Sequence, residues 1–217
     1  NQMVNDTMLN SATNYECYKG MYSSFNSNNL FEIMHSLNRQ FGNENWCLYR
    51  GKHLFNFVDN HDVSRIASQL QNEHHIPLIY GLLFGIPGIP CIYYGSEWGE
   101  RALKSQGDPA LRIEIKEPVV NELTTWISKL SFIKQSNRVL NEGDYRSIFI
   151  SNKQCVFQRQ LDGSRMLIAV NADEHQFYAH FSYEECEAED LITNQKFKIQ
   201  QGFLMEPYRV YFLQVLL

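Results

Sequence analysis

The chain has 217 residues, of which 44% are apolar and 13% aromatic, and its formal net charge is −5. This length suits one large domain or two small ones with a sizeable core. So mild an acidic balance argues against nucleic acid or an anionic membrane as partner. The sequence has no apolar run near the roughly 20 residues of a membrane span, and we see no targeting signal in it.

The first 75 residues alternate between strand-like and helix-like segments. In order, we expect a short strand, a helix, a buried strand and a short helix, over residues 7–11, 30–41, 53–58 and 63–70. Asn29 is the expected N-cap of the first helix, with Glu32 three residues later, and Gly42 is its expected end.

The alternation continues to about residue 135. The pattern predicts a buried helix, a strand and an amphipathic helix, over residues 76–85, 90–95 and 119–133. His74 and His75 precede the buried helix. With no carboxylates at metal-ligand spacing, we place these two histidines in a surface loop and predict no metal site.

After Asn141 the sequence consists of short alternating segments that are rich in β-forming residues. They predict strands over residues 145–150, 154–160, 164–170, 176–181 and 208–215. Asp162-Gly163 is typical of a tight hairpin turn. Alternating strands and helices indicate a parallel sheet or barrel, whereas a run of strands indicates a separate antiparallel sandwich. We therefore expect an α/β domain over residues 1–140 and an all-β domain over residues 141–217.

The strand count of the first part leaves two interpretations open. About three strand–helix units are too few to close an eight-stranded barrel. The first part is then either a small open sheet or the end of a longer protein.

The five cysteines indicate a reducing environment. They are odd in number and widely spaced, without a Cys-x-x-Cys pair, at positions Cys17, Cys47, Cys91, Cys155 and Cys186. Such spacing disfavours a disulfide framework or a structural zinc site, and we expect a cytoplasmic protein.

A polar cluster, Asp59-Asn60-His61-Asp62, directly follows the strand expected over residues 53–58. In parallel βα proteins, residues just past the carboxyl end of a strand face the active-site rim. Charged groups beside a buried strand are costly unless they are paired or used. Capping of the next helix by Asp59 or Asn60 explains the same residues equally well. Alternation along the strand end points Asp59 the other way, away from the site, so we assign it a structural role.

The stretch FVDNHD resembles the end of the seventh barrel strand in the alpha-amylase family of glycoside hydrolases. Three more segments resemble the family in the same order: GIPGIPCIYYGSEWG at 85–99, GDPALR at 107–112 and LSFIKQSNRVLNEGDYRSI at 130–148. The resemblance covers nearly the whole chain. It implies the C-terminal part of a (β/α)8 TIM barrel, about strands six to eight, followed by an antiparallel β-sandwich domain.

The resemblance also implies roles for individual residues. Asp62 matches the third catalytic carboxylate of the family, and His61 matches a donor to hydroxyls of the same sugar. Asp108 and Arg112 match a loop that contacts a sugar farther from the cleaved bond. An exposed ion pair explains these last two residues equally well. We interpret Trp98 as a filler of the core or rim.

Two groups that the family chemistry requires are missing. A retaining glycosidase needs a carboxylate nucleophile and an acid/base carboxyl group. In the family the nucleophile lies in a Gly-x-Arg-x-Asp pattern, and this sequence contains none. The resemblance places both groups upstream of Asn1, so we expect the chain alone to be inactive. It implies no cofactor in this segment, and any calcium ligands would lie upstream.

The leading hypothesis is therefore a fragment of an alpha-amylase-like retaining hydrolase. Its partner would be an α-glucan such as starch or a maltooligosaccharide; the sequence specifies no oligomeric state. The alternatives are a transglycosylase of the same family, a non-catalytic family member and a carbohydrate-binding module. The His61-Asp62 pair argues against the non-catalytic member, because a scaffold has no need of it.

Overall fold

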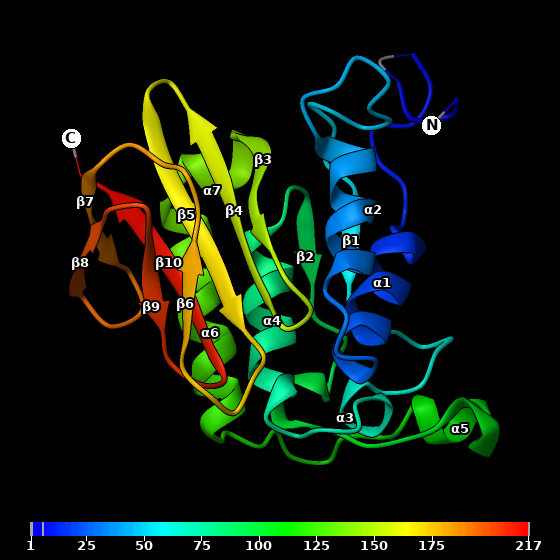
Figure 1. Ribbon diagram of the computed structural model, residues 1–217. Helices are drawn as coiled ribbons and strands as arrows, with labels where there is room; N and C mark the ends of the chain where they lie inside the picture. Colours follow the sequence, from blue (N-terminus) through cyan, green and yellow to red (C-terminus); the bar gives the residue numbers. More distant parts are fainter. Residues whose placement is uncertain (1, 6, 217) are drawn as a thin grey trace.

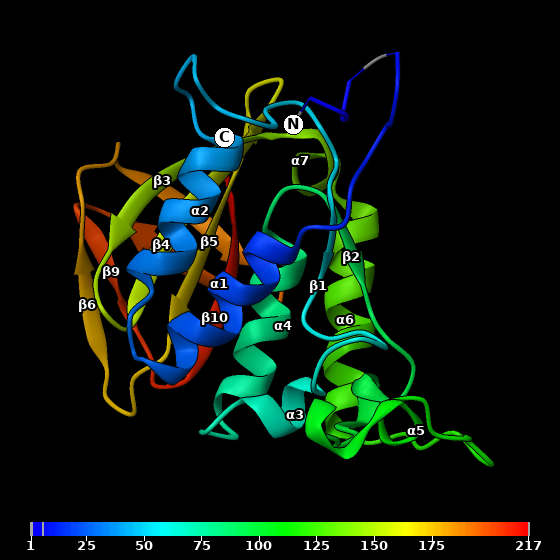
Figure 2. The same cartoon turned by 90° about the vertical axis from the view of Figure 1, so that its right-hand side faces the viewer.

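The computed structural model describes residues 2–5 and 7–216, which are arranged in layers (Figures 1 and 2). A two-stranded ribbon, a larger sheet, a group of helices and a pair of parallel strands follow one another across Figure 2. The helices and strands are α1 Tyr15–Asn26, α2 Phe31–Phe41, β1 Phe55–Phe57, α3 Ile66–Gln69, α4 His75–Gly85, β2 Ile89–Cys91, α5 Asp108–Leu111, α6 Glu122–Ser136, α7 Arg138–Glu142, β3 Asp144–Ile150, β4 Gln154–Leu161, β5 Ser164–Asn171, β6 Phe177–His180, β7 Cys186–Asp190, β8 Gln195–Ile199, β9 Gly202–Met205 and β10 Arg209–Val215.

The parallel layer consists of β1 and β2, which pair from Phe55 opposite Ile89 onward. Thr13 adds a parallel bridge to Phe55 on the other side. The buried side chain of Asn56 joins the surrounding segments. Its Oδ1 accepts a hydrogen bond from Asn14 at 2.8 Å, and its Nδ2 donates to the carbonyl of Pro87 at 2.8 Å. A buried amide of this kind is stable only when its donors and acceptors are used.

The second half is all β. Six antiparallel strands form one sheet in the order β3-β4-β5-β10-β7-β8, and β6 pairs with β9 in a separate ribbon. The hairpin predicted at Asp162-Gly163 is confirmed, since both residues have positive φ, 48° and 84°, between β4 and β5. The protein is therefore a mixed α/β structure with antiparallel sheets.

One hydrophobic core joins the helices to the inner face of the six-stranded sheet. Helix α4 is apolar on all sides and lies at the centre of this core, as its sequence predicts. Gly81 lets α4 approach the sheet closely, because a Cβ there would lie 2.7 Å from Val210 Cγ2. A second core lies between the outer face of the sheet and the β6–β9 ribbon.

Several local predictions are wrong. Residues 7–11 form no strand; Leu9 makes only an isolated bridge to Val4. The N-cap of α2 is Leu30 rather than Asn29, because Glu32 binds Lys19 and Ser23 instead of completing a capping box. The strand expected over 90–95 ends at Cys91. Strands β7, β8 and β9 were not predicted.

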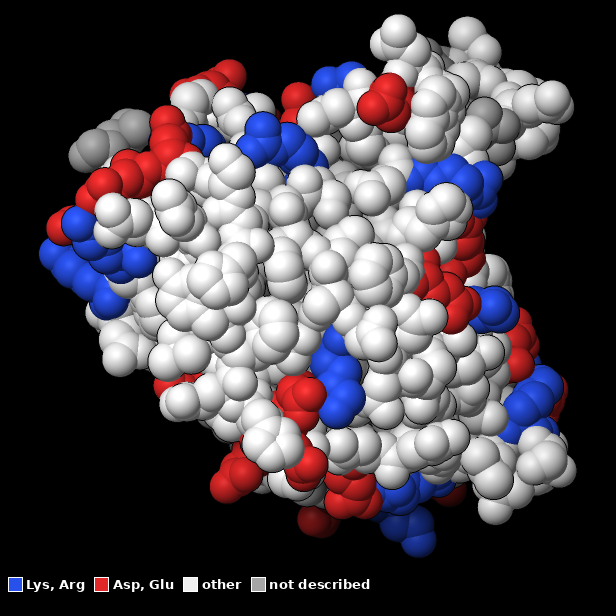
Figure 3. All heavy atoms as spheres, in the orientation of Figure 1, with Lys and Arg blue, Asp and Glu red and all other residues white. Residues whose placement is uncertain are grey.

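None of the helices in residues 2–5 and 7–216 is both long and apolar enough to cross a bilayer. On the face shown in Figure 3, acidic and basic side chains are mixed around the periphery, a basic and an acidic side chain lie side by side just below the middle, and the area above them is uncharged.

Candidate functional site

The chain turns sharply after β1 and divides the polar cluster into a buried and an exposed part. Asp59 is 1% exposed. Its carboxylate accepts hydrogen bonds from the backbone N–H of Ile66 at 2.8 Å and from Ser96 Oγ at 2.7 Å. The structural role predicted for Asp59 is confirmed; the N-cap of α3 is Arg65, and Asp59 only accepts from the first backbone N–H of the helix. It also ties the start of α3 to the loop that follows β2.

Asn60 shapes the exposed part. Its Oδ1 accepts from the backbone N–H of Asp62 at 2.8 Å, and its Nδ2 donates to the hydroxyl of Tyr15 at 3.2 Å. The first bond closes a local turn of the kind that asparagine favours. The turn leaves the side chains of His61 and Asp62 in solvent, 55% and 49% exposed.

The four predicted site residues lie together in one exposed cluster, which we call the rim: His61, Asp62, Asp108 and Arg112. His61 Nε2 lies 3.3 Å from Asp62 Oδ2, and Arg112 Nη2 lies 3.4 Å from Asp62 Oδ1. The same Arg112 nitrogen lies 3.4 Å from Asp108 Oδ2. Figure 2 shows α3 and α5 beneath the lower ends of β1 and β2, where these loops meet. Segments 50 residues apart in sequence thus form one cluster.

Lys104 extends the cluster on one side. Its Nζ donates to Asp108 Oδ1 at 3.0 Å. This hydrogen bond, followed by the charge of Arg112, lowers the pKa of Asp108 below its ordinary value. The side chain of Asp108 is 53% exposed, so its ion pairs contribute little to stability. Their effect is to hold the loop carrying Arg112 against Asp62.

Arg65 supports the rim from beneath and was missed by the sequence reasoning. It is 0% exposed. Its guanidinium donates to the carbonyl of Tyr94 at 2.7 Å and to the carbonyl of Leu111 at 2.9 Å, and it also reaches Ser96 Oγ at 3.1 Å. Five fixed donors make arginine suited to such a clamp. The one feature of the sequence that could have pointed to a role for Arg65 in the site is its position three residues after Asp62.

Aromatic rings line the rim next to Arg65. The guanidinium carbon of Arg65 lies 4.2 Å from the centroid of the Tyr93 ring, which is 6.3 Å from the ring of His61. Burial raises the pKa of the Tyr93 hydroxyl, which donates to the carbonyl of Leu111 at 3.3 Å. Tyr93 is therefore neutral at physiological pH and forms a fixed wall beside His61.

His75 differs from its predicted position in a surface loop. It is 3% exposed, and its Nε2 lies 3.1 Å from the carbonyl oxygen of Ala172. It is the first residue of α4, and its ring lies 5.2 Å from the ring of Phe25; burial lowers its pKa. His74 stacks on Tyr208 at a centroid distance of 4.7 Å.

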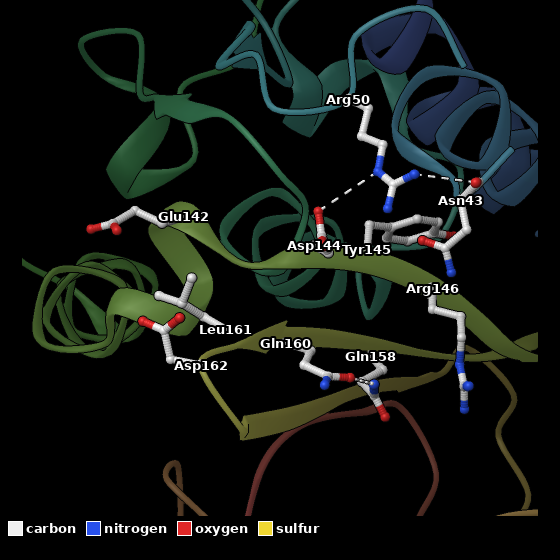
Figure 4. Close-up of a pocket in the computed structure, with 10 residues that line it drawn as sticks. All are labelled: Asn43, Arg50, Glu142, Asp144, Tyr145, Arg146, Gln158, Gln160, Leu161 and Asp162. Atoms are coloured by element: carbon white, nitrogen blue, oxygen red, sulfur yellow. Dashed lines mark hydrogen bonds and ion pairs between the residues drawn. The ribbon is translucent and has the colours of Figure 1, made fainter. Parts of the chain in front are cut away.

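A polar hollow of about 590 Å³ lies along β3 and β4, away from the rim (Figure 4). Arg50 lies at one edge of it, donating to the carbonyl of Asn43 at 3.2 Å and lying 3.9 Å from Asp144. Gln158 donates to Gln160 at 2.8 Å. None of the four predicted site residues lines it.

One group of metal-ligating side chains is close enough to share an ion, Asp173, Glu174 and His175 in the described part of the chain. Asp173 already pairs with Lys153 at 3.1 Å and with His175 at 3.2 Å. Calcium prefers six to eight oxygen ligands. A set with a histidine and an occupied carboxylate does not fit calcium.

The rim offers an exposed carboxylate between an imidazole and a guanidinium, beside a tyrosine ring. Carboxylates accept and guanidinium groups donate hydrogen bonds, so the cluster suits a ligand with neighbouring hydroxyls. The cluster lies at the carboxyl ends of parallel strands, which is where the active sites of (β/α)8 barrel proteins lie.

Comparison with known proteins identifies the family. Residues 2–189 match the family model described as "Alpha amylase, catalytic domain". A cyclomaltodextrin glucanotransferase from Niallia circulans is 32% identical over 118 residues, which are 53% of this chain and 16% of that protein. An intracellular maltogenic amylase from Bacillus subtilis is 30% identical over 125 residues, which are 54% of this chain and 21% of the relative.

Solved structures agree on the fold. An alpha-amylase from Geobacillus thermoleovorans, complexed with acarbose, superposes with a TM-score of 0.83 at 19% identity, covering 94% of this chain and 48% of that one. The cyclomaltodextrin glucanotransferase CldA gives 0.80 at 18% identity, covering 98% and 46%.

The chain belongs to the alpha-amylase catalytic-domain family. It spans 16% and 21% of the two curated relatives and about half of each solved chain.

Proposed function

We propose that this chain is the C-terminal portion of a retaining glycoside hydrolase that acts on α-glucosidic bonds of starch, maltooligosaccharides or related α-glucans. Residues 1–140 would supply about strands six to eight of a (β/α)8 barrel, and residues 141–217 an antiparallel sandwich domain. The parallel order of Thr13, β1 and β2 supports the first assignment. The antiparallel strands from Asp144 onward support the second.

The contact of Asp62 with both His61 and Arg112 is the observation that carries the proposal. Glycoside cleavage passes through a state that resembles an oxocarbenium ion, in which hydrogen bonds to sugar hydroxyls strengthen. A carboxylate held in place by two neighbours can accept such a bond without rearranging. Binding that is stronger in the transition state than in the ground state increases turnover. We assign this role to Asp62, and hydroxyl donation to His61.

Asp108 and Arg112 would contact a more distant sugar of the same glucan. Arg112 lies between the two carboxylates and so links the two sugar positions. We place the nucleophile and the acid/base outside residues 1–217, because the sequence contains no Gly-x-Arg-x-Asp pattern. The chain alone is then a substrate-binding part without turnover.

Transfer of a glucan to a second glucan is the competing function. The relative from Niallia circulans is named a glucanotransferase, and a maltogenic amylase is also among the relatives. Both reactions would use the same rim and differ in whether water or a sugar hydroxyl accepts the cleaved chain.

The test compares the 217-residue chain with a protein extended by its natural upstream coding sequence. Both are incubated with maltoheptaose, and new reducing ends and longer transfer products are measured. We expect activity in the extended protein only, and much less of it after Asp62→Ala. Turnover by the short chain that disappears with Asp62→Ala would contradict the proposal, because a complete active site would then lie within residues 1–217.

A further inference from the structure

A second groove lies on the outer side of the molecule, where the starts of α4 and α6 meet the loop after β2. It encloses about 720 Å³. The indole rings of Trp98 and Trp126 line it together with Ile76, Pro77 and Leu123. It shares no lining residue with the His61–Asp62 rim.

Hydrogen bonds hold the walls of this groove in place. The indole N–H of Trp126 donates to the carbonyl of Pro77 at 2.9 Å. Asn121 donates to the carbonyl of Trp98 at 3.0 Å, and Arg101 donates to the carbonyl of Ala67 at 2.7 Å. Because these bonds anchor the tryptophan segments before any ligand binds, binding costs little additional ordering.

The polar groups of the groove suit a neutral ligand that carries hydroxyls. Arg101 pairs with Glu73 at 2.5 Å, so most of the charge is cancelled. Asn121 and Glu122 add an amide and a carboxylate to the same lining. Amides, carboxylates and guanidinium groups all exchange hydrogen bonds with hydroxyls. A polyanion would be repelled by the carboxylate of Glu122.

We propose that the groove is a second glucan-binding site, which holds an α-glucan chain apart from the catalytic rim. A sugar ring has an apolar face of C–H groups that suits the flat, apolar indole, while its hydroxyl edge suits the polar lining. The choice of an α-glucan rests on the function proposed above. The loop after β2 contributes to both sites. Its residues Trp98 and Arg101 line the groove, and Arg65 binds Tyr94 and Ser96 of the same loop beneath the rim.

The test is a titration of the chain with maltoheptaose, followed by tryptophan fluorescence and calorimetry. We expect Trp98→Ala and Trp126→Ala to weaken binding at the groove at least about tenfold. Trp126→Phe is the second variant, because it keeps apolar packing while it reduces the ring face. Trp46→Ala is the matched control: Trp46 is 60% exposed and lies outside the groove. Thermal unfolding of each variant checks its folding.

The rim variants Asp62→Asn and Arg112→Ala separate this inference from the proposed function. If they leave the tryptophan-dependent binding unchanged, the groove is a site of its own. Binding that disappears in Arg112→Ala but survives both tryptophan variants overturns the inference and supports the rim as the glucan site. No fluorescence or heat change at about 20 mM maltoheptaose also overturns it. The inference is also overturned if the chain self-associates through the groove, so that Trp98→Ala abolishes self-association and glucan has no effect. In these two cases the activity assay of the extended protein still tests the proposed function.

Discussion

Two buried charged residues, Asp59 and Arg65, set the geometry of the rim. Asp59 is 1% exposed and Arg65 0%. Ser96 bonds to both, accepting from Arg65 at 3.1 Å and donating to Asp59 at 2.7 Å. Buried charges of this kind persist only when hydrogen bonds replace water. The exposed residues that would touch a sugar are therefore positioned by a network that a sugar never reaches.

Replacement of Arg65 by methionine should destabilise the protein. The carbonyls of Tyr94 and Leu111 would lose their buried donor, and Asp59 would lose its cationic neighbour. We expect a loss of about 3 kcal/mol in the free energy of unfolding. Urea denaturation measures it. Arg138→Met is the control, since Arg138 forms an exposed ion pair with Glu142 and its loss should have no measurable effect. Equal stability of the two variants would contradict the prediction.

Asp59 should make stability depend on pH in an identifiable way. Burial raises its pKa above the ordinary value of 3.8, despite the opposing hydrogen bonds from Ile66 and Ser96. Between 3.8 and the folded pKa, the folded state binds more protons at this site than the unfolded state. The contribution of Asp59 to stability is therefore present below pH 3.8 and is lost as the pH rises through the folded pKa.

The measurement is urea unfolding of wild type and Asp59→Asn from about pH 4 to about pH 8. Asparagine keeps an acceptor for the N–H of Ile66 but cannot titrate. The stability of Asp59→Asn relative to wild type should rise with pH. A difference that stays constant over this range would show that the carboxyl group is not perturbed.

The residues of the site differed in how far sequence could predict them. Asn60, His61 and Asp62 follow a predicted strand, so their exposure at its end could be anticipated. The burial of Arg65 could not be anticipated, because an arginine in a short polar segment usually lies in water. Its burial depends on carbonyls up to 46 residues away, which local patterns do not reveal.

At the scale of elements, α4 illustrates how a single glycine sets the distance between a helix and a sheet. In Gly81→Ala, the new Cβ would lie 2.7 Å from Val210 Cγ2, so α4 or β10 must move. Overpacking of this kind costs about 1–3 kcal/mol, which exceeds the roughly 1 kcal/mol that alanine gains in helix propensity. We expect a net loss of stability on thermal or chemical unfolding.

Gly20→Ala in α1 is the matched control. Its Cβ would meet the terminal methyl of Ile33 at 3.2 Å, a contact that a small side-chain rotation relieves. Its stability should stay equal or increase. A Gly81→Ala protein that is as stable as Gly20→Ala would mean that α4 can move away from the sheet at no cost.

Long, strongly apolar elements were predicted well, whereas polar strands were not. Helix α4 and strands β4, β5 and β10 are buried almost throughout, and their composition alone indicates burial. Strands β7 and β8 lie near the edge of the sheet and bury few residues, among them Ala188 and Ile199. Their charged sequence is held in place by neighbours such as β10, which is a tertiary effect.

At the scale of the molecule, the core that crosses residue 140 should make both halves unfold together. Cys17 of α1 and Cys155 of β4 belong to this core, and both are 0% exposed. Burial raises the pKa of each thiol to about 12. A buried thiol with so little thiolate reacts only after the protein opens.

Native-state labelling with a thiol reagent tests this cooperativity. In mild urea, Cys17 and Cys155 should become reactive with the same free energy of opening, while the partly exposed Cys47 reacts first. Mass spectrometry identifies each labelled site. Labelling of Cys155 at clearly lower urea than Cys17 would show that the six-stranded sheet opens independently of the helices.

The central claim is that Asp62 acts on the transition state rather than on substrate binding. It is tested by the kinetics of Asp62→Asn in the protein extended by its upstream sequence, with Asp108→Asn as the control on the other side of Arg112. We expect Asp62→Asn to lower kcat at least about 100-fold with little change in KM, and Asp108→Asn to act mainly on KM. An unchanged kcat with a raised KM in Asp62→Asn would contradict the claim and reduce Asp62 to a residue that binds ground state and transition state alike.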